Sequence, residues 1–102
     1  MKDCDLIHVY LVTYDIGNND DRYKIDDFIN LYFCCKLSET TYLVAENDNF
    51  INEIHAIPIT YSDKDTFVII DLTNMEYVGH KGYGNACIKN ILETNKKLFL
   101  LG

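Results

Sequence analysis

The chain has 102 residues, of which 48% are apolar and 25% are charged, and it contains five glycines and one proline. This length and composition suit one compact domain and exclude a collagen-like chain or a long disordered one. Sixteen acidic residues against nine basic ones give a net charge of -7, which opposes binding to nucleic-acid phosphates and to anionic membranes. We treat residues 1–102 as a single domain, with a core over about 6–95 and an apolar C-terminal tail over 96–102.

Cysteine usage and the length of the apolar runs indicate the compartment. The spacing of Cys4, Cys34, Cys35 and Cys87 fits no disulfide framework, and no apolar run of the signal-peptide kind follows the start. The longest apolar runs are far shorter than the roughly 20 residues that span a bilayer. These features predict reduced thiols, no membrane segment and a cytoplasmic location.

The first expected element is a strand over residues 6–15, because β-branched and aromatic side chains alternate there and Gly17 follows as a breaker. One row of its side chains holds Val9, Leu11 and Thr13, and the other holds Tyr10, Val12 and Tyr14. Both rows are largely apolar, so the strand should be central in its sheet and covered on both sides. We expect helices to cover one side, and we assign Tyr10, Val12 and Tyr14 to an interface with a second subunit.

A helix is predicted from Asn19 or Asp20, which are good N-cap residues. Its apolar side is marked by residues spaced three and four apart, namely Ile25, Phe28, Ile29 and Tyr32. The adjacent pair of cysteines would end this helix, and residues 36–39 would connect it to a second strand over 40–46. The alternation therefore predicts strand, helix and strand in the first half of the chain.

A short second helix is expected after Asn47 and Asp48, and Pro58 should stop it. A third strand is predicted over 66–72, followed by an edge strand over 76–80.

Helical spacing predicts a last helix over 83–94. The succession of strand, helix, strand, helix and strand, with a further strand and helix, indicates an α/β sandwich. We expect a ferredoxin-like arrangement, in which an antiparallel sheet carries helices on one face and an extra C-terminal helix is added.

Three segments carry a resemblance, namely residues 9–16 (VYLVTYDI), 37–44 (LSETTYLV) and 67–72 (FVIIDL). Their pattern resembles the SinR family of small ferredoxin-like proteins. More distantly, the same pattern is similar to the small subunit of the CRISPR spacer-integration complex, and it covers about residues 6–80. The resemblance implies a homodimer in which the sheets of two subunits face each other.

The resemblance also implies two different activities. Some members of the integration-complex family are metal-dependent nucleases, in which the Asp at the end of the first strand of each subunit flanks a divalent ion; the matching position is Asp15. Other members only bridge a partner enzyme and duplex DNA. This chain departs from the pattern in its acidity, in lacking a basic run after the first helix and in its extra C-terminal helix.

Asp15 is therefore the candidate catalytic and metal-ligating residue. Mg²⁺ prefers carboxylate oxygens and keeps several waters, one of which could attack a phosphodiester. Alternatively, Asp15 could accept hydrogen bonds from the amides of the following turn. Asp20 and Asp21 could add oxygens to the ion or cap the helix, and Asp71, at a strand end, is open to either interpretation.

We predict a small acidic dimer that acts as a macromolecular interaction module, with a protein partner, no cofactor and weak nucleic-acid binding at most. We favour this non-enzymatic role. The first alternative is a metal-dependent endonuclease that uses Mg²⁺ and Asp15 of each subunit. The second is an inhibitor carried by a phage or mobile element, which presents an acidic surface to a nucleic-acid-binding enzyme.

Overall fold

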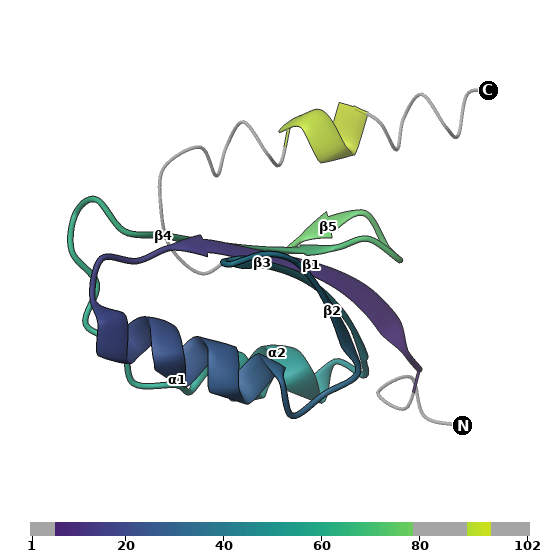
Figure 1. Ribbon diagram of the computed structural model, residues 1–102. Coiled ribbons are helices and arrows are strands. Elements are labelled where there is room, and N and C mark those ends of the chain that lie inside the picture. The colour runs from purple at the N-terminus through teal and green to yellow at the C-terminus, as the bar shows by residue number, and fades with distance from the viewer. Residues whose placement is uncertain (1–5, 79–89, 95–102) are drawn as a thin grey trace.

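The protein combines strands and helices in the computed structural model, which describes residues 6–78 and 90–94. They are β1 (His8–Asp15), α1 (Asn19–Ile29), β2 (Cys34–Ser38), β3 (Thr41–Glu46), α2 (Asn49–His55), β4 (Thr66–Asp71) and β5 (Glu76–Tyr77). The strands form one antiparallel sheet in the order β2-β3-β1-β4-β5. Figure 1 shows α1 and α2 on the same face of this sheet. The described chain is therefore an α+β fold.

Local polar contacts fix both ends of α1. The side chain of Asn18 accepts a hydrogen bond from the backbone N–H of Asp21 at 3.0 Å, and Asp20 and Asp21 place carboxylates at the positive end of the helix dipole. At the other end, the side chain of Asn30 donates to the carbonyl oxygen of Asp26 at 2.9 Å. The helix begins at Asn19 as predicted, but its N-cap is Asn18 and not Asn19 or Asp20.

The segment after α1 differs from the prediction. A connection over 36–39, with the adjacent cysteines at the end of the first helix, is wrong. The helix ends at Ile29, and the cysteines begin β2, which pairs with β3 so that Cys34 lies opposite Val44. The two strands form a hairpin that the alternation of the second strand alone did not reveal.

Apolar residues keep the helical spacing beyond the last residue of α1, which explains why the predicted helix was too long. Tyr32 continues the helical spacing from Ile25 although it lies beyond the end of α1. It still packs against Phe50 of α2, with 5.4 Å between the ring centroids. A side chain can thus belong to the helix layer of the core without helical backbone, so the spacing does not mark where the helix stops.

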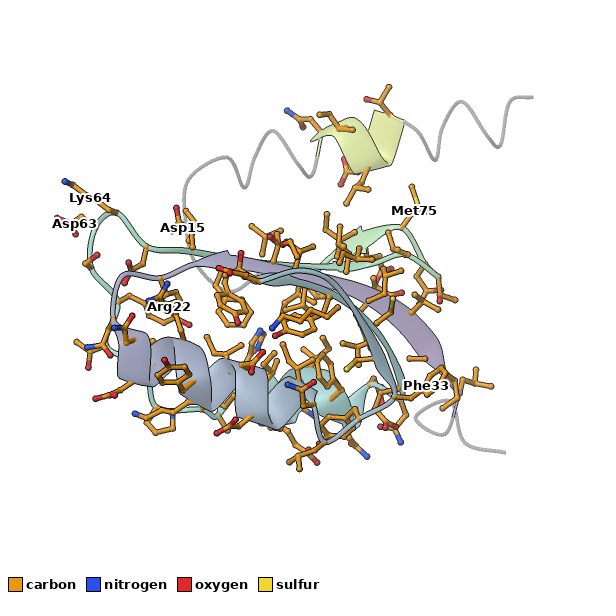
Figure 2. All side chains as sticks on the ribbon, in the orientation of Figure 1. Asp15, Arg22, Phe33, Asp63, Lys64 and Met75 are labelled. Carbon is orange, nitrogen blue, oxygen red and sulfur yellow. The ribbon has the colours of Figure 1, made fainter. Side chains whose placement is uncertain are left out.

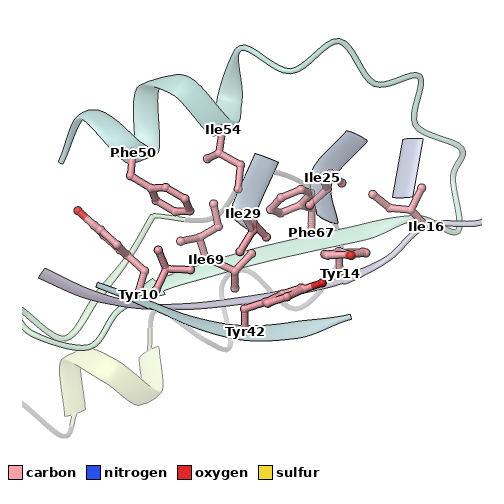
Figure 3. Packing of buried hydrophobic residues seen from close by; sticks show 12 residues of the cluster. Tyr10, Tyr14, Ile16, Ile25, Ile29, Tyr42, Phe50, Ile54, Phe67 and Ile69 are labelled. Carbon is pink, nitrogen blue, oxygen red and sulfur yellow. The ribbon is translucent and has the colours of Figure 1, made fainter. Parts of the chain in front are cut away.

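The core lies between the sheet and its two covering helices (Figure 3). Its buried apolar residues are Tyr10, Val12, Tyr14, Ile16, Ile25, Ile29, Tyr42, Val44, Phe50, Ile54, Phe67 and Ile69. Aromatic rings join the two layers, since Tyr10 on β1 stacks on Phe50 of α2 with 5.5 Å between the centroids. The large rings of the strands fill the space beneath the helices.

The assignment of Tyr10, Val12 and Tyr14 to a subunit interface is wrong about the face. All three are at most 4% exposed and belong to the core beneath the helices. The alternation separates the two rows of β1 correctly, but either row is apolar enough to form a core. The helices cover the aromatic row, which leaves the row of Val9 and Leu11 on the opposite face.

The remaining elements follow the prediction closely. β1, β3, β4 and α2 confirm the three strands and the short helix, with ends that shift by one or two residues. Of the edge strand predicted over 76–80, the first two residues form β5, and residues 79–80 lie outside the described residues. The helix predicted over 83–94 and the tail over 96–102 also lie outside them, apart from residues 90–94.

Residues 90–94 are helical. Figure 1 shows them on the side of the sheet opposite to α1 and α2. No helix within residues 6–78 and 90–94 is long and apolar enough to cross a membrane.

Candidate functional site

The face of the sheet opposite to α1 and α2, which we call the open face, carries two rows of mainly apolar side chains across its strands. The backbone register places Cys35, Leu43, Leu11 and Ile70 opposite one another in the first row. The second row runs through Phe33, Ala45, Val9 and Leu72. Side chains directly opposite on one face of antiparallel strands lie about 5 Å apart, so each row is continuous.

Exposure of the open face is greatest near the β2 edge. Val9 and Leu72 are 38% and 39% exposed, and Phe33, just before β2, is 83% exposed. Val9 and Phe33 also line an apolar groove of about 260 Å³ together with Cys35 and Leu43. Adjoining exposed apolar side chains mark interaction surfaces, whereas isolated ones carry no such meaning. The open face is therefore the candidate functional site.

Part of this surface was missed from the sequence because β2 was not recognised. Phe33, Cys35 and Leu37 place apolar side chains at every second position, which is the period of a strand. This alternation was the signal that could have placed them on one sheet face.

The open face becomes polar where β1 leaves the sheet. The hydroxyl groups of Thr13 and Thr41, which lie opposite each other, share a hydrogen bond of 3.0 Å. Asp15 follows Thr13 on the same face, lies opposite Thr66 and is exposed (Figure 2). The predicted metal ligand thus lies at the polar end of the apolar rows.

The structure does not bring the other candidate carboxylates to Asp15. Asp20 and Asp21 belong to the first turn of α1, on the helix side of the sheet. Asp71 lies opposite Tyr10, five residues along β1 from Asp15, which corresponds to about 17 Å. Within the described part of one chain, no group of three or more His, Cys, Asp or Glu side chains is placed to hold a metal ion. A metal at Asp15 would need ligands from elsewhere, such as a second copy.

Asp71 has a structural role that the sequence revealed only in part. The His8 ring donates from Nδ1 to Oδ2 of Asp71 at 2.8 Å, and the backbone N–H groups of Thr73 and Asn74 donate to Oδ1 at 3.0 and 3.1 Å. Bonds to the amides two and three residues on form an Asx turn, which sequence patterns can predict. His8 is 63 residues away, so no local pattern points to it. The buried carboxylate joins the start of β1 to the β4–β5 turn.

The described cations do not belong to the apolar rows of the open face. They are Arg22, Lys24, Lys36 and Lys64. The ammonium group of Lys24 lies 3.4 Å from Asp21 Oδ1, and that of Lys36 lies 3.5 Å from Asp26 Oδ1, both beside α1. Lys64 lies in the turn before β4. Among the described residues, the apolar rows therefore contain no positively charged side chain that could contact a polyanion such as DNA.

No protein-family model matches the chain, and no curated protein or solved structure matches it significantly. The resemblance to the SinR family and to the integration-complex subunit stays a hypothesis that rests on residues 9–16, 37–44 and 67–72.

Proposed function

We propose that this protein is a macromolecular interaction module that forms a homodimer through the open face of its sheet. The observation that carries the proposal is the pair of mainly apolar rows across four strands, opposite to the face that α1 and α2 cover. Fully burying an exposed Val, Leu, Ile or Phe side chain contributes about 1.5–3 kcal/mol, so a few such residues suffice for association. The rows contain no charged residue, which lets two copies of an acidic chain approach there.

The proposal includes a ferredoxin-like classification of the fold. The element order strand, helix, strand, strand, helix, strand supports it, and so does the strand order β2-β3-β1-β4 with every neighbouring pair antiparallel. Residues 90–94 lie on the open-face side of the sheet, so two copies would meet over the part of the open face that these residues leave exposed, and a twofold axis makes the same patch serve both subunits.

Sedimentation velocity at micromolar concentration tests the dimer. Val9→Asp and Leu11→Asp each place a carboxylate in an apolar row, and we expect both variants to sediment as monomers. Asn52→Asp adds the same charge on the exposed side of α2 and should leave the dimer intact. Circular dichroism shows whether each variant is folded. A monomeric unmodified protein across the concentration range would overturn the proposal.

A protein partner is proposed at the rim of the open face, where Phe33 is 83% exposed. Binding by this apolar side chain should persist at high salt, whereas docking of an acidic surface on a basic enzyme should weaken. Capture of a partner that Phe33→Ser abolishes at high salt would support the rim. Capture that survives Phe33→Ser and is lost with salt would instead favour the inhibitor alternative.

The position of Asp15 on the open face favours the endonuclease alternative. Asp15 is exposed on the same open face, so a dimer through this face turns the two Asp15 carboxylates towards the space between the subunits. Mg²⁺ bound there would supply a water nucleophile and a positive charge for a phosphodiester. No group of three or more metal-ligating side chains surrounds Asp15 within the described residues, so this alternative draws its further ligands from the second copy.

A further inference from the structure

A second, polar cavity lies on the helix side of the sheet, away from the open face. It has a volume of about 320 Å³ and is lined by Tyr14 of β1, Arg22 and Asp26 of α1, Lys36 of β2, and Glu39 and Thr40 of the β2–β3 turn. Pockets for small molecules begin at about this volume. Its lining mixes two cations, two carboxylates and hydroxyl groups, unlike the apolar groove beside Phe33.

The Tyr14 hydroxyl is an unpartnered donor in this cavity. Tyr14 is 4% exposed, and no described residue hydrogen-bonds to its hydroxyl group. Burial, and next the charge of Asp26, raise the pKa of Tyr14 to about 12, so the phenol keeps its proton at neutral pH. The hydroxyl oxygen of Tyr14 is not fully enclosed by protein, so the phenol can donate a hydrogen bond to a ligand in the cavity.

Arg22 supplies an unpaired positive charge to the same cavity. No described residue forms an ion pair or a hydrogen bond with its guanidinium group, whereas Lys24 and Lys36 each face a carboxylate. Figure 2 shows Arg22 between α1 and the sheet, and its charge acts on the Tyr14 phenol by lowering its pKa against the effect of burial. A guanidinium group and a phenol that donate into one cavity match a carboxylate or another oxyanion.

The acidic residues of the lining narrow the choice of ligand. Asp26 accepts a hydrogen bond from the Tyr42 hydroxyl and faces Lys36, so its charge is largely engaged. Glu39 is exposed and makes no contact of this kind within the described residues. A phosphate dianion would be repelled by both carboxylates, whereas a ligand with one carboxylate and one ammonium group finds a partner for each charge.

We propose that this cavity binds a small zwitterion of the α-amino-acid class, whose carboxylate is held by Arg22 and Tyr14 and whose ammonium group lies towards Glu39. This inference does not depend on the proposed dimer, because the cavity is on the other side of the sheet.

NMR titration of the full chain with each standard α-amino acid tests the inference. We expect at least one to shift the backbone amides around Arg22 and Thr40. Its N-acetyl derivative, its α-amide and inorganic phosphate should each bind at least about tenfold more weakly, since each lacks one of the two charges or carries an excess. No shift with any amino acid, or equal binding of the N-acetyl derivative or of phosphate, would overturn the proposal.

Variants separate binding from folding. Arg22→Gln should weaken the amino acid about tenfold or more, and Tyr14→Phe about threefold to tenfold, because each removes a donor to a carboxylate. Tyr32→Phe removes a phenol that hydrogen-bonds to Glu53, outside the cavity, and should leave the affinity unchanged. Unchanged affinity in both Arg22→Gln and Tyr14→Phe would place any bound amino acid elsewhere and refute the assignment.

Discussion

Tyr42 on β3 donates its hydroxyl hydrogen bond to Asp26 on α1 and so links the sheet to the helix layer at the edge of the core. Tyr14, on the neighbouring strand, stacks on Tyr42 with 6.5 Å between the ring centroids. Its own hydroxyl has no such partner among the described residues. Two adjacent buried phenols thus differ chiefly in one hydrogen bond to a carboxylate.

This difference predicts unequal effects of removing the two hydroxyl groups. We expect Tyr42→Phe to lower the free energy of unfolding by about 1–2 kcal/mol, because it removes a hydrogen bond to a charged group that is partly exposed. Tyr14→Phe should change it by less than about 0.5 kcal/mol, since no protein hydrogen bond is lost. Urea unfolding followed by circular dichroism measures both, and equal losses would contradict this arrangement.

Alkaline pH should destabilise the protein through its buried tyrosines. Burial, followed by the charge of Asp71 for Tyr10 and of Asp26 for Tyr14, raises the pKa of each phenol from 10.0 to about 12. Below pH 10 both states keep these protons, and the stabilisation is fully present. Above pH 10 the unfolded chain releases them first, so the free energy of unfolding falls as the pH rises towards 12.

Urea unfolding at a series of pH values between 10 and 12, with phenolate absorbance recorded in parallel, checks this expectation. Tyr10→Phe removes one of the raised pKa values and should make the decline with pH shallower. A free energy of unfolding that stays constant over this range would show that these phenols ionise equally easily in both states.

The alternation of apolar and polar side chains predicted most of the fold, but it did not reveal β2. β1, β3 and β4 have rows of β-branched and aromatic residues, so local propensity and burial agree. β2 is a short edge strand whose side chains are mostly exposed, and Tyr32 extends the apolar spacing of α1 towards it. Local pattern therefore favoured a longer helix, and only pairing with β3 defines the strand.

The candidate sites depend on contacts that sequence order does not encode. Alternation showed that β1 has two apolar rows. Which row enters the core and which lies on the open face depends on the side of the sheet on which the helices pack. The polar cavity joins Tyr14, Arg22 and Lys36 from three different elements, and none of them has a motif around it. Asp15 was placed correctly at the end of its strand, whereas the contact of Asp71 with His8 required the fold.

Asp15→Asn tests the endonuclease alternative directly. We expect the unmodified protein, incubated with duplex and single-stranded DNA in Mg²⁺ or Mn²⁺, to cleave no more than this variant does. The reason is that no group of three or more His, Cys, Asp or Glu side chains within the described residues is placed to hold a metal ion. Asp63→Asn, in the exposed turn before β4, is the matched control. Reproducible cleavage that only Asp15→Asn abolishes, at unchanged melting temperature, would overturn our preference for a non-enzymatic role.

Weak binding to duplex DNA is the last expectation, and it follows from the placement of charge. A firm non-specific binder neutralises several phosphates, and the chain has nine Lys and Arg residues against sixteen Asp and Glu residues. Among the described cations, Lys24 and Lys36 each lie beside a carboxylate, and the open face has none in its apolar rows. We therefore expect a dissociation constant no tighter than the range of about 10⁻⁴ to 10⁻⁶ M at physiological salt. Fluorescence anisotropy with a labelled random duplex measures it, and a salt series gives the number of phosphates contacted. Submicromolar binding with a steep salt dependence would mean that the cations gather on one surface of the assembled protein, and would restore the DNA-bridging role that the family resemblance implies.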